Sequence, residues 1–566
     1  MQKIYEMFAA AVNTLRSEVL PNFYLVSSNY LESFLQVFDA EALAWLSMES
    51  YMLFWVCLMW VTVGLVKTPY ASSAQIILIN MTTKYTSMMV LVGAMVYACY
   101  RSQDLGDTVY LLNDMVILDN WVNWAQLGIL LLAFIFLSLT SPYTHTRNSY
   151  YYELVIFTLT VTMLMTWLIM SWNFIIFYLI LEGISLIFYT VATRTFSYGG
   201  VESGLKYYSL GALASVLLLV GVLCVFAAVG STDFLVASLW LKWQTLANSR
   251  SLLLVVGLTL ILMALFFKLS AFPGHVWTPD VYQGTTLEVL WIFAVLAKYA
   301  FIVIFLRFFI LFYFTPNMYS VTTFWVTTAC LGSLIIGAVG AFLATDIKRF
   351  IAYTAINQMG FLFMGLSVMT VDGLKSTIAY LYIYMLANVL FFAVVTLLQS
   401  KKLLVGEVSV RSLKDFALLK KAPMEVGLMA VALLSLGGLP PLAGFFGKYT
   451  LWTTVITHYL EAEAMGMGEN LLYILVTSIV VSWLSTFYYL RLIKMALFDN
   501  FGEFKAPVIN ASNAMDVSLS SFILLLLGTL TVGWIFMLPD LDLLWTRFAV
   551  ALVSPFTSFT NPFDWS

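Results

Sequence analysis

Acidic and basic side chains stand in the middle of long apolar stretches of this chain. Glu182 lies in WNFIIFYLILEGISLIFYTVA (172–192), and Lys298 lies in LEVLWIFAVLAKYAFIVIFLRF (287–308). Each is about ten residues from either end of its stretch, so at ~1.5 Å per residue it would lie near the midplane of a bilayer. A charge at that depth costs ~2.5–3.5 kcal/mol on insertion scales and is by default a functional candidate. Alternatively, Glu182 is a neutral, hydrogen-bonded carboxyl that fixes helix packing.

Two more lysines lie next to prolines that interrupt apolar helices. Lys268 precedes such a break, and Lys448 follows another in LSLGGLPPLAGFFGKYTLW (434–452). Proline has no N–H, and the backbone carbonyls it frees are tolerated at membrane depth only against protein or internal water. Both lysines are therefore expected to face a polar interior, unless the breaks are ordinary kinks of membrane helices. The predicted helix breaks are at Pro273, Pro440 and Pro441.

Three other polar residues allow more than one interpretation. Lys206, in GLKYYSLGALAS, is near the start of an apolar stretch, where a lysine that reaches the interface is the simpler interpretation. His275 could relay protons or could hydrogen-bond the interrupted backbone. Asp280 could cap the second half of the interrupted helix or pair with a lysine.

Proton relay is the chemistry that suits these groups. Burial disfavours the charged form of a lysine, whereas a nearby carboxylate favours it. Several lysines with one acid therefore form a chain of coupled titrating sites rather than a pocket for an organic substrate. The sequence contains no nucleotide-binding loop, haem-ligand pair or iron–sulfur motif, and its four cysteines have no CxxC spacing. We expect no cofactor and no metal to be bound by this chain.

Composition places these residues in a polytopic helical membrane protein. Hydrophobic residues make up 62% of the chain and charged residues only 10%, against about 25% charged in soluble domains. We predict about fourteen spans and a loop or surface helix at 231–250, and the net charge of −3 gives no indication of nucleic-acid binding. The predicted spans are 42–66, 76–99, 120–141, 151–170, 173–193, 204–229, 251–271 resuming at 276–285, 287–311, 318–342, 347–368, 376–399, 424–438 resuming at 441–460, 470–495 and 517–538.

Lysine and arginine are concentrated in alternate predicted loops, above all in 400–421. The positive-inside rule therefore places the loops after odd-numbered spans on the negative side of the membrane, and both termini on the other side. Among the few basic residues assigned to the opposite loops are Arg101 and Arg307.

The two interrupted helices occupy corresponding places in two sets of five spans. This pattern predicts two inverted five-helix repeats, spans 4–8 and spans 9–13, as in transporters built from repeats of opposite topology. The predicted domains are a lead-in (1–41), three first spans (42–141), repeat 1 (151–311), repeat 2 (318–495), and a last span with the C-terminal tail (496–566).

Four stretches resemble the antiporter-like membrane subunits of respiratory complex I, in particular the branch numbered 2 in mitochondria and N in bacteria. The resemblance extends from about Asp119 to Asp499. It is carried by FFKLSAFPGHVWTPDVYQGTT (266–286), DIKRFIAYTAINQMGFLFMGLS (346–367), LPPLAGFFGKYTLW (439–452) and STFYYLRLIKMALFD (485–499).

The resemblance implies proton-relay roles for five residues. One of them is Lys206, for which this role replaces the interpretation as a lysine that reaches the interface. Two positions depart from the family pattern. Gln358 stands where histidine is common, and a glutamine cannot titrate. Gly274 stands where a larger apolar residue usually precedes the histidine, which predicts looser packing around His275. The implied relay residues are Glu182, Lys206, Lys268, Lys298 and Lys448.

Membership would make the chain a proton-translocating subunit of an NADH:ubiquinone reductase, with no redox centre of its own. NADH, FMN, iron–sulfur clusters and ubiquinone would then be handled by other subunits. Its partners would be other membrane-arm subunits, including neighbouring antiporter-like ones, and membrane lipids. The expected location is the mitochondrial inner membrane or, alternatively, a bacterial plasma membrane. Other possibilities are a subunit of a multisubunit cation/proton antiporter and an assembly scaffold whose channel is inactive.

Overall fold

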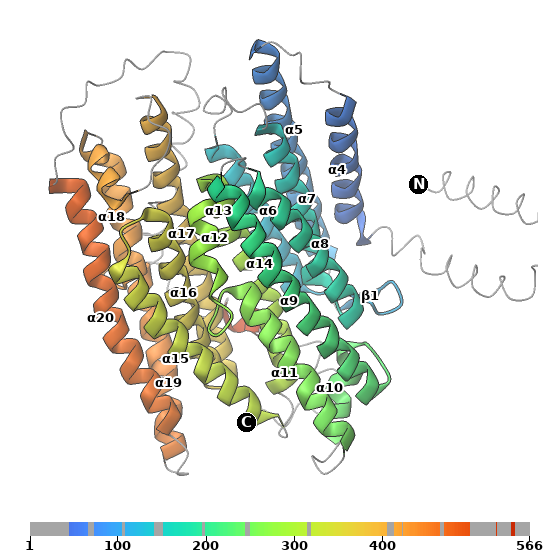
Figure 1. Ribbon diagram of the computed structural model, residues 1–566. Coiled ribbons are helices and arrows are strands. Elements are labelled where there is room, and N and C mark those ends of the chain that lie inside the picture. The colour runs from blue at the N-terminus through green and yellow to red at the C-terminus, as the bar shows by residue number, and fades with distance from the viewer. Residues whose placement is uncertain are drawn as a thin grey trace, which may run out of the picture.

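A computed structural model describes most of the chain, drawn as ribbon in Figure 1. The lead-in 1–41 lies outside the described residues, as does the predicted span 517–538 except for Gly528. The described residues are 45–65, 73–104, 108–140, 151–194, 198–243, 249–313, 318–404, 412–421, 423–463, 469–498, 528 and 545–549.

The described part is a bundle of long helices, as the apolar stretches predict. Within the described residues, eleven helices are long and apolar enough to cross a membrane. A helix is present at every predicted span as far as 470–495, while the predicted total of fourteen is not tested. The helices are α4 (Ser47–Leu65), α5 (Ser73–Asp104), α6 (Asn120–Leu139), α7 (Tyr151–Met170), α8 (Phe174–Thr193), α9 (Tyr198–Val229), α10 (Phe234–Trp243), α11 (Ser249–Leu269), α12 (Trp277–Gly284), α13 (Leu287–Trp291), α14 (Lys298–Tyr313), α15 (Tyr319–Leu343), α16 (Ile347–Leu366), α17 (Val371–Leu404), α18 (Pro423–Gly437), α19 (Ala443–Glu463) and α20 (Glu469–Phe498).

The sequence pattern did not predict four smaller elements. Strands β1 (Val109–Leu111) and β2 (Val116–Leu118) form an antiparallel hairpin. A π-helical turn, η3 (Ile292–Ala297), joins α13 to α14, and a 3₁₀ helix, η4 (Leu413–Lys421), precedes α18. In Figure 1, β1 and α10 lie toward one end of the bundle and α12 and α13 toward the other.

Helices that correspond between the two predicted repeats make corresponding contacts. In the first set α8 packs on α7 and α9, and α9 packs on both halves of the interrupted helix, α11 and α12. In the second set α16 packs on α15 and α17, and α17 packs on α18 and α19. The last helix of each set, α14 or α20, returns to contact the first, α7 or α15. These equivalent contacts agree with a two-repeat architecture.

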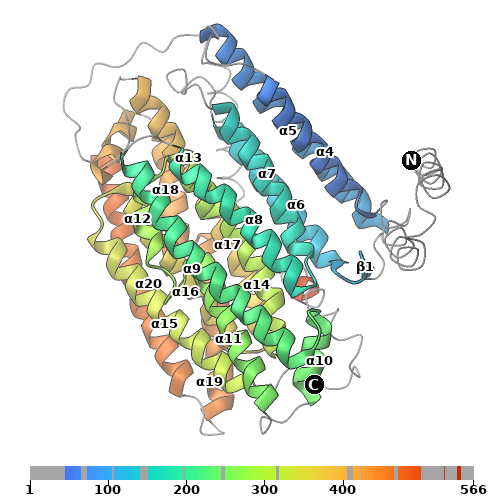
Figure 2. The ribbon, with the colours of Figure 1, turned by 45° about the vertical axis from the view of Figure 1, so that its right-hand side comes forward.

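The first helices are attached to the bundle by a buried polar network. Figure 2 shows α4 and α5 as an outer layer beside α7. The Arg101 Nη1 atom lies 3.2 Å from Glu49 Oε1, and the Arg101 Nε atom donates to Asn123 Oδ1 at 3.1 Å. Gln126 Nε2 donates to Glu49 Oε1 at 3.1 Å and to the Thr166 carbonyl at 3.2 Å. Arg101 thus belongs to a buried ion pair that connects α4, α5, α6 and α7, and its assignment to a loop is wrong.

Candidate functional site

Both interrupted helices end in the same hydrogen-bond pattern. After α11, Ser270 N donates to Phe267 O and Ala271 N donates to Phe266 O; after α18, Gly438 N donates to Ser435 O and Leu439 N donates to Leu434 O. This pair of bonds defines a Schellman cap, whose key residue adopts positive φ. That residue is Ser270 (φ 58°) in the first break and Gly438 (φ 81°) in the second.

In each break, a proline preceded by a cis peptide bond lies three residues after the residue with positive φ. The bonds are Phe272–Pro273 and Pro440–Pro441. Pro273, Pro440 and Pro441 were predicted to break the helices, and all three lie between the two halves of an interrupted helix. The freed backbone of the first break contacts protein, because Trp277 Nε1 donates to Phe267 O at 2.9 Å.

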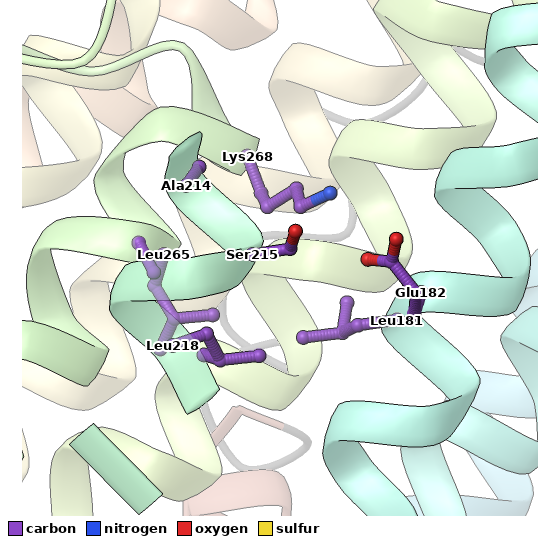
Figure 3. Close-up of a pocket in the computed structure, with 8 residues that line it drawn as sticks. Leu181, Glu182, Ala214, Ser215, Leu218, Leu265 and Lys268 are labelled. Carbon is purple, nitrogen blue, oxygen red and sulfur yellow. The ribbon is translucent and has the colours of Figure 1, made fainter. Parts of the chain in front are cut away.

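Glu182 and Lys268 line the same small hollow between α8, α9 and α11. Figure 3 shows their polar ends facing the space between the helices, with Ser215 from α9 beside them. The hollow has room for about one water molecule. The Lys268 Nζ atom donates to Ser185 Oγ at 2.7 Å, one helical turn after Glu182 on α8. The Lys268 ammonium is therefore held directly by the Ser185 hydroxyl and attracted electrostatically by the Glu182 carboxylate. Lys268 and Glu182 do not form a direct ion pair.

Lys298 begins α14 directly after the π-helical turn. Its side chain is only 2% exposed, and its Nζ atom has no hydrogen-bond partner within the described part of the chain. A π-helical turn withholds an ordinary helical hydrogen bond, and such turns are frequent at functional sites. Here the Ala294 carbonyl accepts from Asn388 Nδ2 of α17 at 3.5 Å. A buried ammonium without a protein partner requires water or must lose its proton.

Lys448 lies in a cradle formed by the second break. Its Nζ atom donates to the Gly437 carbonyl at 2.8 Å and lies 4.4 Å from the centre of the Phe361 ring. The carbonyl end of a helix and the face of an aromatic ring both favour a cation. Gln358 Nε2 donates to the preceding carbonyl, Leu436 O, at 3.2 Å. The cradle therefore includes the glutamine that departs from the family pattern.

Lys206 and Asp280 lie together at the surface of the bundle. The Lys206 Nζ atom is 3.2 Å from Asp280 Oδ2 and 2.9 Å from Glu202 Oε1, and the lysine side chain is 45% exposed. Asp280 thus pairs with a lysine, which was one of its two predicted roles. No hydrogen bond or ion pair among the described residues joins Lys206 to Glu182 or Lys268.

His275 is half-buried at the first break and contacts none of the lysines through a hydrogen bond within the described residues. Its ring stacks on Phe272, and its Nδ1 atom has no hydrogen-bond partner among the described residues. The preceding Gly274 is tightly packed, because a Cβ there would lie 2.5 Å from Phe267 Cα. The prediction that Gly274 loosens the break is wrong: the absence of a side chain lets the two backbones touch.

The sequence interpretation missed a second buried ion pair, Asp119–Arg307. Arg307 falls within the predicted span 287–311 but was counted with the loop that follows it. It lies inside α14, is 1% exposed, and donates through Nη2 to Asp119 Oδ2. An arginine at the end of a long apolar stretch is compatible with either position, so hydropathy could not distinguish them. The sequence signal that could have drawn attention to Asp119 is its position as an N-cap aspartate directly before α6.

A family model described as "NADH:quinone oxidoreductase/Mrp antiporter, TM" matches residues 171–484. Subunit N of NADH-quinone oxidoreductase from Paramagnetospirillum magneticum is 31% identical over 450 residues, covering 78% of this chain and 88% of the relative. The chain belongs to this family. NADH-ubiquinone oxidoreductase chain 2 of Marchantia polymorpha is 31% identical over 388 residues, covering 68% of this chain and 75% of that one. The resemblance to the 2 or N branch is therefore confirmed.

The fold of the family is present as well. A chain of respiratory complex I from Thermus thermophilus aligns with a TM-score of 0.66 and 24% identity, covering 87% of this chain and 98% of that chain. At that identity the alignment supports the polytopic helical, antiporter-like fold, and the sequence relatives support the branch.

Proposed function

We propose that this chain is the subunit 2 or N component of a respiratory complex I, and that it translocates protons within the membrane arm. The observation that carries this proposal is the placement of buried lysines at two equivalent helix breaks, one of them facing Glu182 across a shared hollow. The sequence relatives named subunit N or chain 2 support the same assignment. The family description also includes Mrp antiporters, which remain the second candidate.

The proposed relay consists of Glu182, Lys206, Lys268, Lys298 and Lys448. A negative charge on Glu182 stabilises the ammonium of Lys268, and its withdrawal or neutralisation favours release of the proton. Lys298 passes the proton on through water, because it has no protein partner among the described residues. Lys448 receives it in a cradle without a carboxylate. The exposed Lys206–Asp280 pair is the proposed access point, and His275 is the proposed accessory group.

The redox chemistry belongs to other subunits in this proposal. NADH, FMN, iron–sulfur clusters and ubiquinone would be bound there, and this chain would contribute only charge movement. Its partners would be the neighbouring membrane-arm subunits and lipids. The proposed domains are the three first spans, repeat 1 (151–311), repeat 2 (318–495) and the terminal parts on either side. The membrane is a mitochondrial inner membrane or a bacterial plasma membrane.

Substitution of the hollow's two charged residues tests the relay. Lys268→Ala and Glu182→Gln in the assembled complex should each remove most proton pumping measured in vesicles during NADH oxidation. Lys494→Ala, which removes an exposed lysine of α20, is the matched control and should pump normally. Normal pumping by either hollow variant would reject the relay assignment.

Purification of the native assembly separates the two candidate functions. Flavin- and iron–sulfur-containing subunits should co-purify with this chain if it belongs to complex I. A set of cation/proton antiporter subunits in their place would reject the complex I proposal and support the alternative.

A further inference from the structure

The interrupted helix of repeat 1 is held at its end by the start of a helix of repeat 2. The second half of that interrupted helix, α12, ends at Gly284, and the last carbonyls of a helix have no partner within it. Lys348, in the first turn of α16, donates through Nζ to the Gln283 carbonyl at 3.4 Å and to the Thr285 carbonyl. The helix dipole also favours an ammonium at this position. Lys348 therefore caps α12 from the neighbouring repeat.

The Gln283 side chain makes the same connection from α12. Its Nε2 atom donates to Asp346 Oδ2 at 2.8 Å, and its Oε1 atom accepts from Arg349 Nε at 2.7 Å. Asp346 is the N-cap residue of α16, and Arg349 lies in its first turn. We call Asp346, Lys348 and Arg349 the α16 clamp. Exposed polar contacts are individually weak, so the clamp depends on their convergence on one turn of chain, 283–285.

The position of α12 is passed on to the residue before Lys268. Because α12 is only eight residues long, its two ends cannot shift independently. At its start, Trp277 Nε1 donates to the carbonyl of Phe267. In addition, Phe363 of α16 packs on Phe266 at the end of α11, with ring centroids 5.4 Å apart. Helix α16 therefore contacts both halves of the first break.

The same helix contributes to the cradle of Lys448 at the second break. Gln358 follows Lys348 by ten residues, or about 15 Å along the axis at ~1.5 Å per residue, and donates to Leu436 O at the end of α18. The Phe361 ring, three residues further, lies 4.4 Å from Lys448 Nζ. Because α16 is a continuous α-helix without proline, a displacement of its first turn is carried along the axis to these side chains.

A backbone bridge connects the start of α16 to the segment that leads into the second interrupted helix. Asp346 pairs with Ser412 in an antiparallel bridge, and Leu413 N donates to Thr345 O at 3.1 Å. Ser412 is itself held by Asp415, whose Oδ1 atom accepts from Ser412 Oγ at 3.0 Å. Since η4 begins at Leu413 and precedes α18, the first turn of α16 is bonded both to α12 and to the approach to α18.

We propose that α16 is a strut that couples the positions of the two helix breaks, and that Asp346, Lys348 and Arg349 are the positioning residues that attach it to α12. A displacement of one break then shifts the side chains that surround the lysine of the other. The importance of the strut for pumping rests on the proposed relay, because Lys268 and Lys448 need a common geometry only if both carry protons.

Hydrogen exchange in the assembled complex tests the strut. Gly438→Ala strains the second break, because φ is 81° at this position, and mass spectrometry reports amide exchange in α12, in the other repeat. We expect several-fold faster exchange in α12 and no change in α10, which lies toward the opposite end of the bundle (Figure 1). Gly427→Ala, whose Cβ would meet nothing within 4 Å, is the matched control and should leave exchange in α12 unchanged.

Removal of the clamp shows whether the effect travels through it. When Gln283→Ala and Lys348→Met are combined, adding Gly438→Ala should no longer accelerate exchange in α12. An equal acceleration with and without the clamp would overturn the proposal. Unchanged exchange in α12 of the single Gly438→Ala variant would overturn it as well, as would a rise of the same size in α10, which indicates general loosening. If the Gly438→Ala complex does not assemble, Gln358→Leu disturbs the same break.

Proton pumping tests whether the clamp serves the relay. Lys348→Met should lower the number of protons pumped per NADH oxidised, whereas Lys348→Arg can donate to the same two carbonyls and should retain the wild-type ratio. A purely structural defect lowers the amount of assembled complex but not this ratio. A wild-type ratio in Lys348→Met would overturn the positioning role. Failure of the relay itself is recognised separately, by normal pumping in the Lys268→Ala complex, and the exchange measurements do not depend on it.

Discussion

At the scale of single residues, Gln358 has a structural role that does not depend on titration and was not predicted from the sequence. The hydroxyl of Tyr380 donates to Gln358 Oε1, and Gln358 Nε2 donates to Leu436 O and, at 3.3 Å, to Tyr489 Oη. The next carbonyl, Gly437 O, receives Lys448. One amide therefore fixes the break beside the lysine and the two tyrosines around it.

Replacing Gln358 tests this role. Gln358→Leu leaves a buried carbonyl and two hydroxyls without their partner, at a cost of about 1–3 kcal/mol for each group that water does not reach. We expect lower thermal stability of the purified complex and weaker proton pumping. Gln358→His, which retains one donor and one acceptor, should preserve more of both properties. A Leu variant as stable and active as wild type would show that the network does not position Lys448.

At the scale of elements, the two helix breaks illustrate what hydropathy and proline placement can predict. Spans and breaks followed from apolar length and proline chemistry, and α7 has the predicted bounds. Side-chain partners could not be predicted, because lipid-facing and protein-facing sides of a membrane helix are equally apolar. Pairing of Asp280 with some lysine was foreseen, but its partner Lys206 was not. That partner, the π-helical turn before Lys298 and the close contact at Gly274 all depend on neighbouring helices.

The second cap provides a sharp test of the break geometry. At Gly438, φ is 81°, and an added Cβ would lie 2.7 Å from Lys448 Cδ. Gly438→Ala should therefore lower stability by ~1–2 kcal/mol through backbone strain alone and displace the Lys448 side chain, reducing pumping. Thermal unfolding of the purified complex and proton uptake by vesicles measure the two effects.

Gly427 provides the matched control within α18. A Cβ there would meet nothing within 4 Å, and alanine is favoured over glycine in a helix interior by about 0.5–1 kcal/mol. Gly427→Ala should be neutral or slightly stabilising and should pump normally. Equal behaviour of the two variants would mean that the cap does not determine the position of Lys448.

At the scale of the whole molecule, two buried ion pairs connect the first helices to the first repeat. Asp119–Arg307 joins the start of α6 to α14, and Glu49–Arg101 joins α4 to α5, with Gln126 extending the connection to α7. Both pairs lie toward the end that the charge bias assigns to the positive side. The outer layer seen in Figure 2 is thus attached at this end by buried polar contacts, in addition to apolar packing such as that of Trp60 on Phe157.

A comparison of single and double substitutions tests this attachment. Arg101→Met strands the fully buried carboxylate of Glu49, and removal of one partner from a buried ion pair costs about 3–5 kcal/mol. The double variant Glu49→Leu/Arg101→Met removes both charges and should recover much of that loss, because well-packed apolar side chains can replace a buried pair. Thermal unfolding, together with limited proteolysis of the α4–α5 layer, should rank the single variant as least stable. If the double variant is as unstable as the single one, the network holds α4 and α5 through its hydrogen bonds to Asn123 and Gln126 rather than through compensation of charge.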